Sequence, residues 1–116
     1  MKQKELEILL QQVPPFSNPN PNLEQYMTPA NIAADIIFTS HQLEDIENKT
    51  VLDLGCGTGI FAMGAALTGA GEVIGIDIDP QCTETARKHA EKNNLKIEFL
   101  VRDVKDVDIH LSLIHI

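Results

Sequence analysis

Three glycines at alternate positions form the segment of this sequence that most directly indicates chemistry. Gly55, Gly57 and Gly59 follow the apolar run 51–54 and precede a second run of apolar and small residues. Glycines let a strand turn sharply into a helix, and their lack of side chains lets a ligand lie against bare backbone. The free N–H groups at the start of the following helix then point at that ligand. The loop therefore predicts a site for a nucleotide-containing cofactor.

The spacing of these glycines separates two classes of cofactor. A dinucleotide-binding fingerprint has its third glycine or alanine one residue later, at the position that Ile60 occupies here. Asp53 stands two residues before the first glycine, where its carboxylate could accept a hydrogen bond from a cofactor's ammonium group, directly or through water. A tight turn without any ligand is the alternative, and the strand–loop–helix context favours the cofactor.

Two further aspartates follow the next two apolar runs. Asp77 lies about 20 residues beyond the first glycine, the separation that places an acid on the ribose hydroxyls of a bound nucleotide. Asp79 competes for that role, but its position directly before a proline predicts a helix cap. Asp103 could accept from an adenine amino group, and Val104 would offer a backbone N–H and an apolar wall. Aspartates at strand ends are common, so both assignments depend on the glycine loop.

The elements that must position these residues follow from hydrophobic periodicity and from the placement of proline and glycine. A helix is predicted near residues 2–12, and another begins at Thr28-Pro29 with Thr28 as its cap. The remaining pattern alternates strand and helix, which predicts right-handed crossovers and an α/β, Rossmann-like fold with parallel strand order 3-2-1. The strands are expected at 51–54, 73–77 and 97–101, and the intervening helices at 60–67 and 80–92.

The chain divides into three parts on this interpretation. Residues 1–22 form an N-terminal helix and a loop rich in proline and asparagine, and residues 23–108 form the cofactor-binding half-domain. Sheets of this kind continue on the far side of the first strand, and no such strand is expected here. We therefore expect a sheet truncated after its third strand, with residues 109–116 as a non-native or disordered tail.

Composition excludes several classes of protein. The formal net charge is −8 without a cluster of Lys and Arg, so a basic surface for nucleic acid must come from elsewhere. Cys56 and Cys82 are far apart and predict neither a metal site nor a disulfide framework. No apolar run approaches the roughly 18 residues of a membrane span, and the short apolar run near the N-terminus, which lacks a small-residue cleavage site, is not interpreted as a secretory signal. These features predict a cytoplasmic protein.

The motifs around the three aspartates together resemble those of class I S-adenosylmethionine (AdoMet) methyltransferases. A narrower resemblance begins upstream, where residues 23–33 are similar to the Glu-Gln-Tyr-x-Thr-x-x-x-Ile-Ala segment of methyltransferase-like protein five. That group methylates adenine N6 in ribosomal RNA, and the resemblance runs from about residue 23 to residue 108. It implies AdoMet as cofactor, an RNA substrate for the full-length protein, and a small zinc-ribbon activator subunit as partner.

The resemblance also implies a set of cofactor contacts. Gln25 and Thr28 would fold over the bound cofactor, while Asp103 and Val104 would lie beside the adenine. The full predicted set is Gln25, Thr28, Asp53, Gly55, Gly57, Thr58, Gly59, Ile60, Asp77, Asp103 and Val104.

The catalytic motif of that group, Asn-Pro-Pro-Phe after a fourth strand, does not follow Val104. Pro14-Pro15-Phe16 is preceded by Val13, which has no side-chain acceptor, and stands before the glycine loop, so we interpret it as a loop. No residue is therefore predicted to be catalytic, and we expect the chain alone to methylate nothing. A protein or small-molecule methyltransferase and a non-catalytic AdoMet-binding module are the alternatives, with a nicotinamide-binding domain a distant third.

Overall fold

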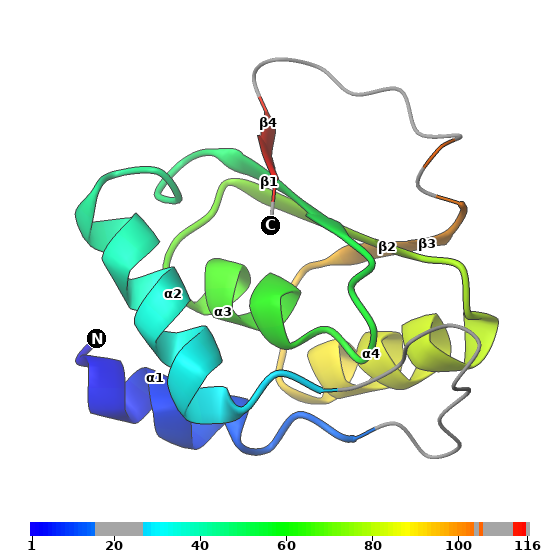
Figure 1. The fold of residues 1–116 in the computed structure, drawn as a ribbon, viewed down its shortest axis with the longest axis horizontal. Coiled ribbons are helices and arrows are strands. Elements are labelled where there is room, and N and C mark those ends of the chain that lie inside the picture. The colour runs from blue at the N-terminus through cyan, green and yellow to red at the C-terminus, as the bar shows by residue number, and fades with distance from the viewer. Residues whose placement is uncertain (16–26, 104, 106–112, 116) are drawn as a thin grey trace.

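The computed structural model describes residues 1–15, 27–103, 105 and 113–115. Helices and strands alternate after an N-terminal pair of helices, and Figure 1 shows the helices gathered below the strands in that view. The elements are α1 (Gln3–Leu10), α2 (Ala30–Gln42), β1 (Thr50–Leu54), α3 (Ile60–Leu67), β2 (Glu72–Asp77), α4 (Pro80–Lys92), β3 (Glu98–Val101) and β4 (Leu113–His115).

The strands form one parallel sheet in the order β3-β2-β1-β4. Val51 of β1 is in register with Val73 of β2, and Ile76 of β2 with Leu100 of β3. The predicted order 3-2-1 is confirmed, with strand ends that differ by one residue. Helices α3 and α4 have the predicted limits, and α3 packs on β1 and β2 while α4 packs on β2 and β3.

A short fourth strand lies beside β1, where the sequence predicted none. Thr50 and Val51 of β1 pair in parallel with Leu113 and Ile114 of β4. The pairing has a simple cause, because β1 would otherwise present a row of unpaired backbone groups along an apolar edge, and residues 111–114 are rich in apolar side chains. Residues 109–112 and 116 of the predicted tail lie outside the described residues.

The core lies between the sheet and the N-terminal helices. Leu6 and Leu10 of α1 are completely buried, and they belong to the same cluster as Ile37 of α2 and Met63 of α3. The helices α2 and α3 approach closely at Gly64, where an added Cβ would lie 2.9 Å from a side-chain carbon of Ile37. This packing fixes α3, and therefore the turn that leads into it from β1.

Candidate functional site

The turn from β1 into α3 has the backbone that the three glycines predict. Gly55, Gly57 and Gly59 have φ angles of +71°, +56° and +95°, in the left-handed region that other residues avoid. The N–H groups of Gly55 and Cys56 both donate to the carbonyl of Ile76, at 2.7 and 2.9 Å, which ties the loop to β2. The loop is therefore a fixed turn at the carboxyl end of the sheet, where open α/β folds bind their ligands.

The glycines of this loop have different surroundings. A Cβ added at Gly55 would meet no atom within 4 Å, so open space lies over its backbone. A Cβ added at Gly59 would lie 3.2 Å from the Cβ of Ala86 and 3.4 Å from the Cε of Met63. Gly55 can therefore admit a ligand against its backbone, whereas Gly59 allows the start of α3 to pack against α4.

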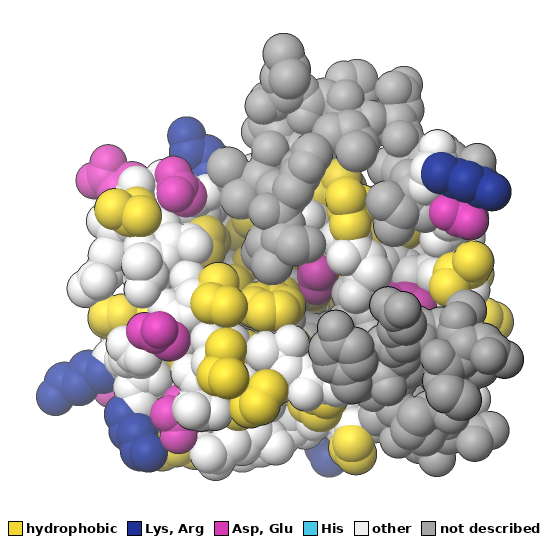
Figure 2. All heavy atoms as spheres, viewed as in Figure 1, with side chains coloured by type: hydrophobic (Ala, Val, Ile, Leu, Met, Phe, Trp, Pro, Cys, Tyr) yellow, Lys and Arg dark blue, Asp and Glu magenta, His cyan; other side chains and the backbone are white. Residues whose placement is uncertain are grey.

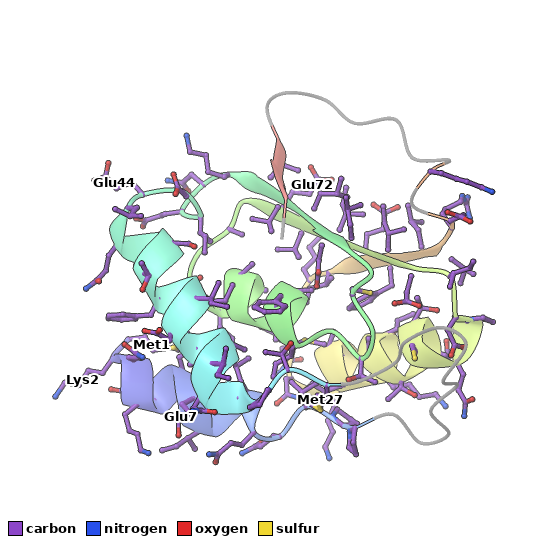
Figure 3. All side chains as sticks on the ribbon, in the orientation of Figure 1. Met1, Lys2, Glu7, Met27, Glu44 and Glu72 are labelled. Carbon is purple, nitrogen blue, oxygen red and sulfur yellow. The ribbon has the colours of Figure 1, made fainter. Side chains whose placement is uncertain are left out.

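A small hollow opens beside the loop and brings together parts of the chain that are far apart in sequence. Its volume is about 80 Å³, and it is lined by Met27, Thr28, Gly55, Cys56, Gly57, Thr58, Ile60 and Phe61. Figure 3 labels Met27, directly before α2. A typical ligand pocket has roughly 300–1,000 Å³, so the hollow accommodates only part of a cofactor. Met27 and Phe61 were not predicted, because nothing marks them as different from core residues.

Thr28 lies in the predicted region but has a different local role. Helix α2 begins at Ala30 with Pro29 as its N-cap residue, and no side chain caps it. The prediction that Thr28 caps this helix is wrong, because the helix starts one residue later than the Thr-Pro pattern implied. The half-buried Thr28 lines the hollow instead, and Gln25 lies outside the described residues.

Asp53 is buried at the end of β1, with 2% of its surface exposed. Its Oδ2 accepts a hydrogen bond of 3.1 Å from the N–H of Ala62 in the first turn of α3. Burial raises the pKa of this carboxyl to about 7, the Ala62 bond opposes that change, and the charge of Asp77 adds to it. Asp53 thus links β1 to α3, and its contact with a cofactor ammonium group stays a prediction.

Asp77 ends β2 and faces the glycine loop. Its Oδ2 accepts from the N–H of Gly57 at 2.8 Å, and its Oδ1 accepts from the N–H of Asp79 at 2.9 Å. A carboxylate can accept about four hydrogen bonds, so both oxygens retain capacity for ribose hydroxyls. The Oδ1 of Asp79 accepts from the N–H of Gln81 at the start of α4, which confirms Asp79 as the helix cap.

Asp103 lies just beyond β3, at the same edge of the sheet as Asp77. Its side chain is partly exposed, and its Oδ1 accepts from the backbone N–H of Lys105 at 3.1 Å. The Nζ of Lys105 is 3.8 Å from its Oδ2. The predicted adenine contact of Asp103 has no further support here, and Val104 lies outside the described residues.

Other reactive groups near the loop do not form a second centre. Burial raises the pKa of the Cys56 thiol far above its usual range and that of Cys82 to about 12, so both stay protonated at neutral pH. Among the described residues no group of three His, Cys, Asp or Glu side chains is arranged to hold a metal ion. Pro14 lines a separate cavity beside α4.

In the described part of the chain, no helix has the length and apolar character that crossing a membrane requires.

Most of the chain matches a known protein-family model. Residues 37–112 match the model of the ribosomal protein L11 methyltransferase (PrmA). The matched range includes the whole glycine loop and the three aspartates Asp53, Asp77 and Asp103.

Three curated relatives differ in how much of this chain they match. The uncharacterized protein MJ0284 of Methanocaldococcus jannaschii is 43% identical over 93% of the chain, and the rRNA N(6)-adenosine-methyltransferase METTL5 of Danio rerio is 46% identical over 82%. The chain spans 48% and 46% of these two proteins, about half of their length. A ribosomal protein L11 methyltransferase of Dechloromonas aromatica is 58% identical over 46% of the chain, which spans 18% of that protein.

Solved structures match the same architecture. A putative RNA methyltransferase, PH1948 of Pyrococcus horikoshii, superposes on 97% of this chain with a TM-score of 0.89 and 36% identity, and 58% of that protein is covered. The tRNA (uracil-54, C5)-methyltransferase of Pyrococcus abyssi, solved with S-adenosyl-L-homocysteine, matches 72% of the chain with a TM-score of 0.60 and 28% identity. The match covers 21% of that protein.

Proposed function

Because the chain belongs to the class I AdoMet-dependent methyltransferases, the family that the ribosomal protein L11 methyltransferase model represents, we propose that its full-length protein methylates adenine N6 in RNA. Ribosomal RNA is the proposed substrate class. AdoMet is the cofactor of this family, and it supplies a methyl group carried on a positively charged sulfonium. The catalytic Asn-Pro-Pro-aromatic motif and a small zinc-ribbon partner subunit belong to the same proposal, and both concern the full-length protein.

The extent of the matches supports RNA over protein as the substrate. The L11 methyltransferase model begins at residue 37, and the Dechloromonas enzyme matches less than half of the chain. A match over 82% of the chain, as with METTL5, must extend N-terminal of residue 37. The segment before residue 37 includes Met27 and Thr28, which line the hollow beside the glycine loop. The N-terminal part of the site is therefore shared with a relative whose name denotes RNA methylation.

In this proposal, several of the described residues each make a different contribution to cofactor binding. The open backbone at Gly55 leaves room for the cofactor, and the carboxylate of Asp77 accepts from the ribose hydroxyls. Thr28 closes the hollow over the loop. Asp53 keeps the start of α3 in place through Ala62. Together these contacts orient the cofactor, and orientation of the reacting groups is the main contribution a protein makes to methyl transfer onto a base.

Protein methylation is the second candidate function. It is favoured by the L11 methyltransferase matches, since the family model covers residues 37–112 and the Dechloromonas relative is 58% identical over 46% of the chain. The acidic balance of the chain, with net charge −8, also gives no general attraction for a polyanion. A non-catalytic AdoMet-binding module would bind cofactor and label neither substrate, so the substrate assay separates all three.

The chain itself is expected to bind AdoMet more tightly than NAD. The physical reason is the loop, because Ile60 occupies the position where a dinucleotide fingerprint needs a glycine or alanine for close helix–strand packing. Isothermal titration calorimetry of the chain with each cofactor measures the difference. Tighter binding of NAD than of AdoMet would contradict both the cofactor and the family-based function.

The full-length protein, with its partner subunit, is expected to transfer radiolabelled methyl groups from AdoMet to ribosomal RNA. Purified total ribosomal RNA and total ribosomal protein are offered in parallel reactions, and labelled RNA is digested to nucleosides. Label in N6-methyladenosine supports the proposal. Label confined to ribosomal protein would establish the second candidate, and absence of label in both would indicate a binding module.

A further inference from the structure

A second and larger cavity lies away from the glycine loop, between α4 and the segment that follows α1. Its volume is about 370 Å³, and it is lined by Gln12, Pro14, Thr85, Lys88, His89, Lys92 and Asn93. Figure 1 shows the segment after α1 running below α4 in that view. The residues from α4 fall at helical spacings of three and four, so one face of this helix forms a wall of the cavity.

The charge of this cavity is opposite to that of the whole chain. Two lysines line it, and no Asp or Glu is among the described residues of its lining, although the net charge is −8. In the face drawn in Figure 2, by contrast, basic side chains are scattered around the edge and form no patch. The two lysines are four residues apart and therefore share one face of α4, and folding encloses this face by placing Gln12 and Pro14 against it.

The acidic residues of α4 neutralise only part of this face, because Lys88 forms an ion pair with Glu84. Glu84 and Glu91 both pair with the guanidinium of Arg87, on the neighbouring face of the helix. Lys88 is 4.0 Å from Glu84, and Lys92 has no ion pair within the described part of the chain. The pKa of His89 is lowered, first by burial and then by the charge of Lys92, so its ring experiences the positive field of the cavity.

We propose that this cavity binds a backbone phosphate of the RNA substrate, with Lys88 and Lys92 as its two charged contacts. The proposal rests on the proposed function and adds where the RNA strand is held. The hydroxyl of Thr85 and the amide of Gln12 supply neutral donors beside the ammonium groups, which suits an anion with several acceptor oxygens.

The cavity lies toward the C-terminal end of α4, away from the carboxyl edge of the sheet. Lys88 is nine residues along the helix from Asp79, or about 14 Å at the rise of an α-helix. Asp79 adjoins Asp77 at the carboxyl edge of the sheet, where the cofactor is held. An RNA strand that contacts both this cavity and the cofactor site would have to run along α4, and its phosphate contact here would carry affinity without reading the sequence.

The test compares two double variants with the same change in net charge. Lys88→Gln with Lys92→Gln alters the cavity, whereas Lys2→Gln with Lys4→Gln alters the start of the N-terminal helix, where Figure 3 labels Lys2. Binding of a fluorescein-labelled single-stranded RNA to the chain is measured by anisotropy across a series of salt concentrations. Calorimetry with AdoMet and thermal unfolding show whether each variant keeps its fold.

The cavity variant is expected to lose about tenfold in RNA affinity at low salt, and the slope of log K against log salt is expected to fall by about 0.7, the value for one phosphate on a single strand. The control variant is expected to keep the slope of the unaltered chain. Equal losses in both variants would overturn the inference, since they would reflect net charge alone. Absence of salt-dependent RNA binding by the unaltered chain, or tighter binding of a poly-glutamate peptide than of RNA through these lysines, would also overturn it.

The failures of the two proposals are distinguishable. If the full-length protein methylates RNA while the cavity variant keeps an unchanged salt slope, only the phosphate site is wrong. If the salt slope falls as expected but the full-length protein labels no RNA, only the proposed reaction is wrong.

Discussion

Replacing Asp77 by alanine is expected to weaken AdoMet binding by roughly 1.5–3 kcal/mol, or about 10- to 150-fold in affinity. The carboxylate is placed to accept from both ribose hydroxyls, and hydrogen bonds to a charged acceptor fall in this energy range. Asp77 also accepts from the N–H groups of Gly57 and Asp79, so its loss releases the glycine loop as well. Titration calorimetry of the chain with AdoMet measures the change.

Asp79→Ala is the matched control, because it removes a neighbouring carboxylate from the same turn. Asp79 caps α4 through the N–H of Gln81, and loss of such a cap lowers the free energy of unfolding by about 1 kcal/mol. The substitution keeps the hydrogen bond from the backbone N–H of residue 79 to Asp77, so affinity for AdoMet should change little. If both variants are equally well folded and lose the same affinity for AdoMet, Asp77 is not the residue that binds the ribose hydroxyls.

Local signals were sufficient to predict most of the sheet and its helices. Asp79-Pro80 places a cap and a first-turn proline side by side, and the observed helix starts there. The glycines after β1 indicate a tight turn at the end of that strand, and all three have positive φ. The order β3-β2-β1 is the Rossmann arrangement that the strand–helix alternation and the glycine loop together predicted. Each of these features is specified within a few residues of where it appears.

Features that depend on distant parts of the chain were not predictable in the same way. The strand β4 forms through pairing with β1, about 60 residues earlier in the sequence, and the apolar character of residues 111–114 alone does not specify that partner or its register. The cationic cavity needs Gln12 and Pro14 to lie against α4, and no periodicity reports that contact. Asp53 was predicted from its spacing to the glycines, but its bond to Ala62 appears only once α3 is in place.

Asp53→Asn is expected to make the folded chain more stable at alkaline pH and to weaken AdoMet binding. The carboxyl has a pKa of about 7 when folded and 3.8 as its ordinary value, so between these pH values the folded chain holds a proton that the unfolded chain has released. The free energy of unfolding therefore falls as pH rises through this window, by up to roughly 4 kcal/mol in total. Asparagine keeps an oxygen for the N–H of Ala62 and has no charge to bury.

Denaturant unfolding of both chains at pH 5 and pH 8 measures this effect. The difference in stability between variant and parent should shift in favour of the variant by roughly 2–3 kcal/mol from pH 5 to pH 8. Any cost in free energy of burying the amide cancels from this pH-dependent change, because that cost is the same at both pH values. Asp35→Asn, on the exposed face of α2, makes the same change in charge and should give no comparable shift. A shift of equal size in that control would show that the effect comes from net charge.

A contact with the cofactor would account for the presence of a buried carboxylate beside the glycine loop, although its burial opposes folding. AdoMet carries its methyl on a cationic sulfonium and also has an ammonium group, so its binding favours the ionised form of Asp53 if the predicted contact is made. Affinity in the parent should then rise as pH increases through about 7, the pKa of the free site, and this rise should be absent in Asp53→Asn. Calorimetry with AdoMet at pH 6 and pH 8 distinguishes the two roles. An affinity that depends on pH equally in both chains would leave Asp53 as a support for α3 alone, through its bond to Ala62.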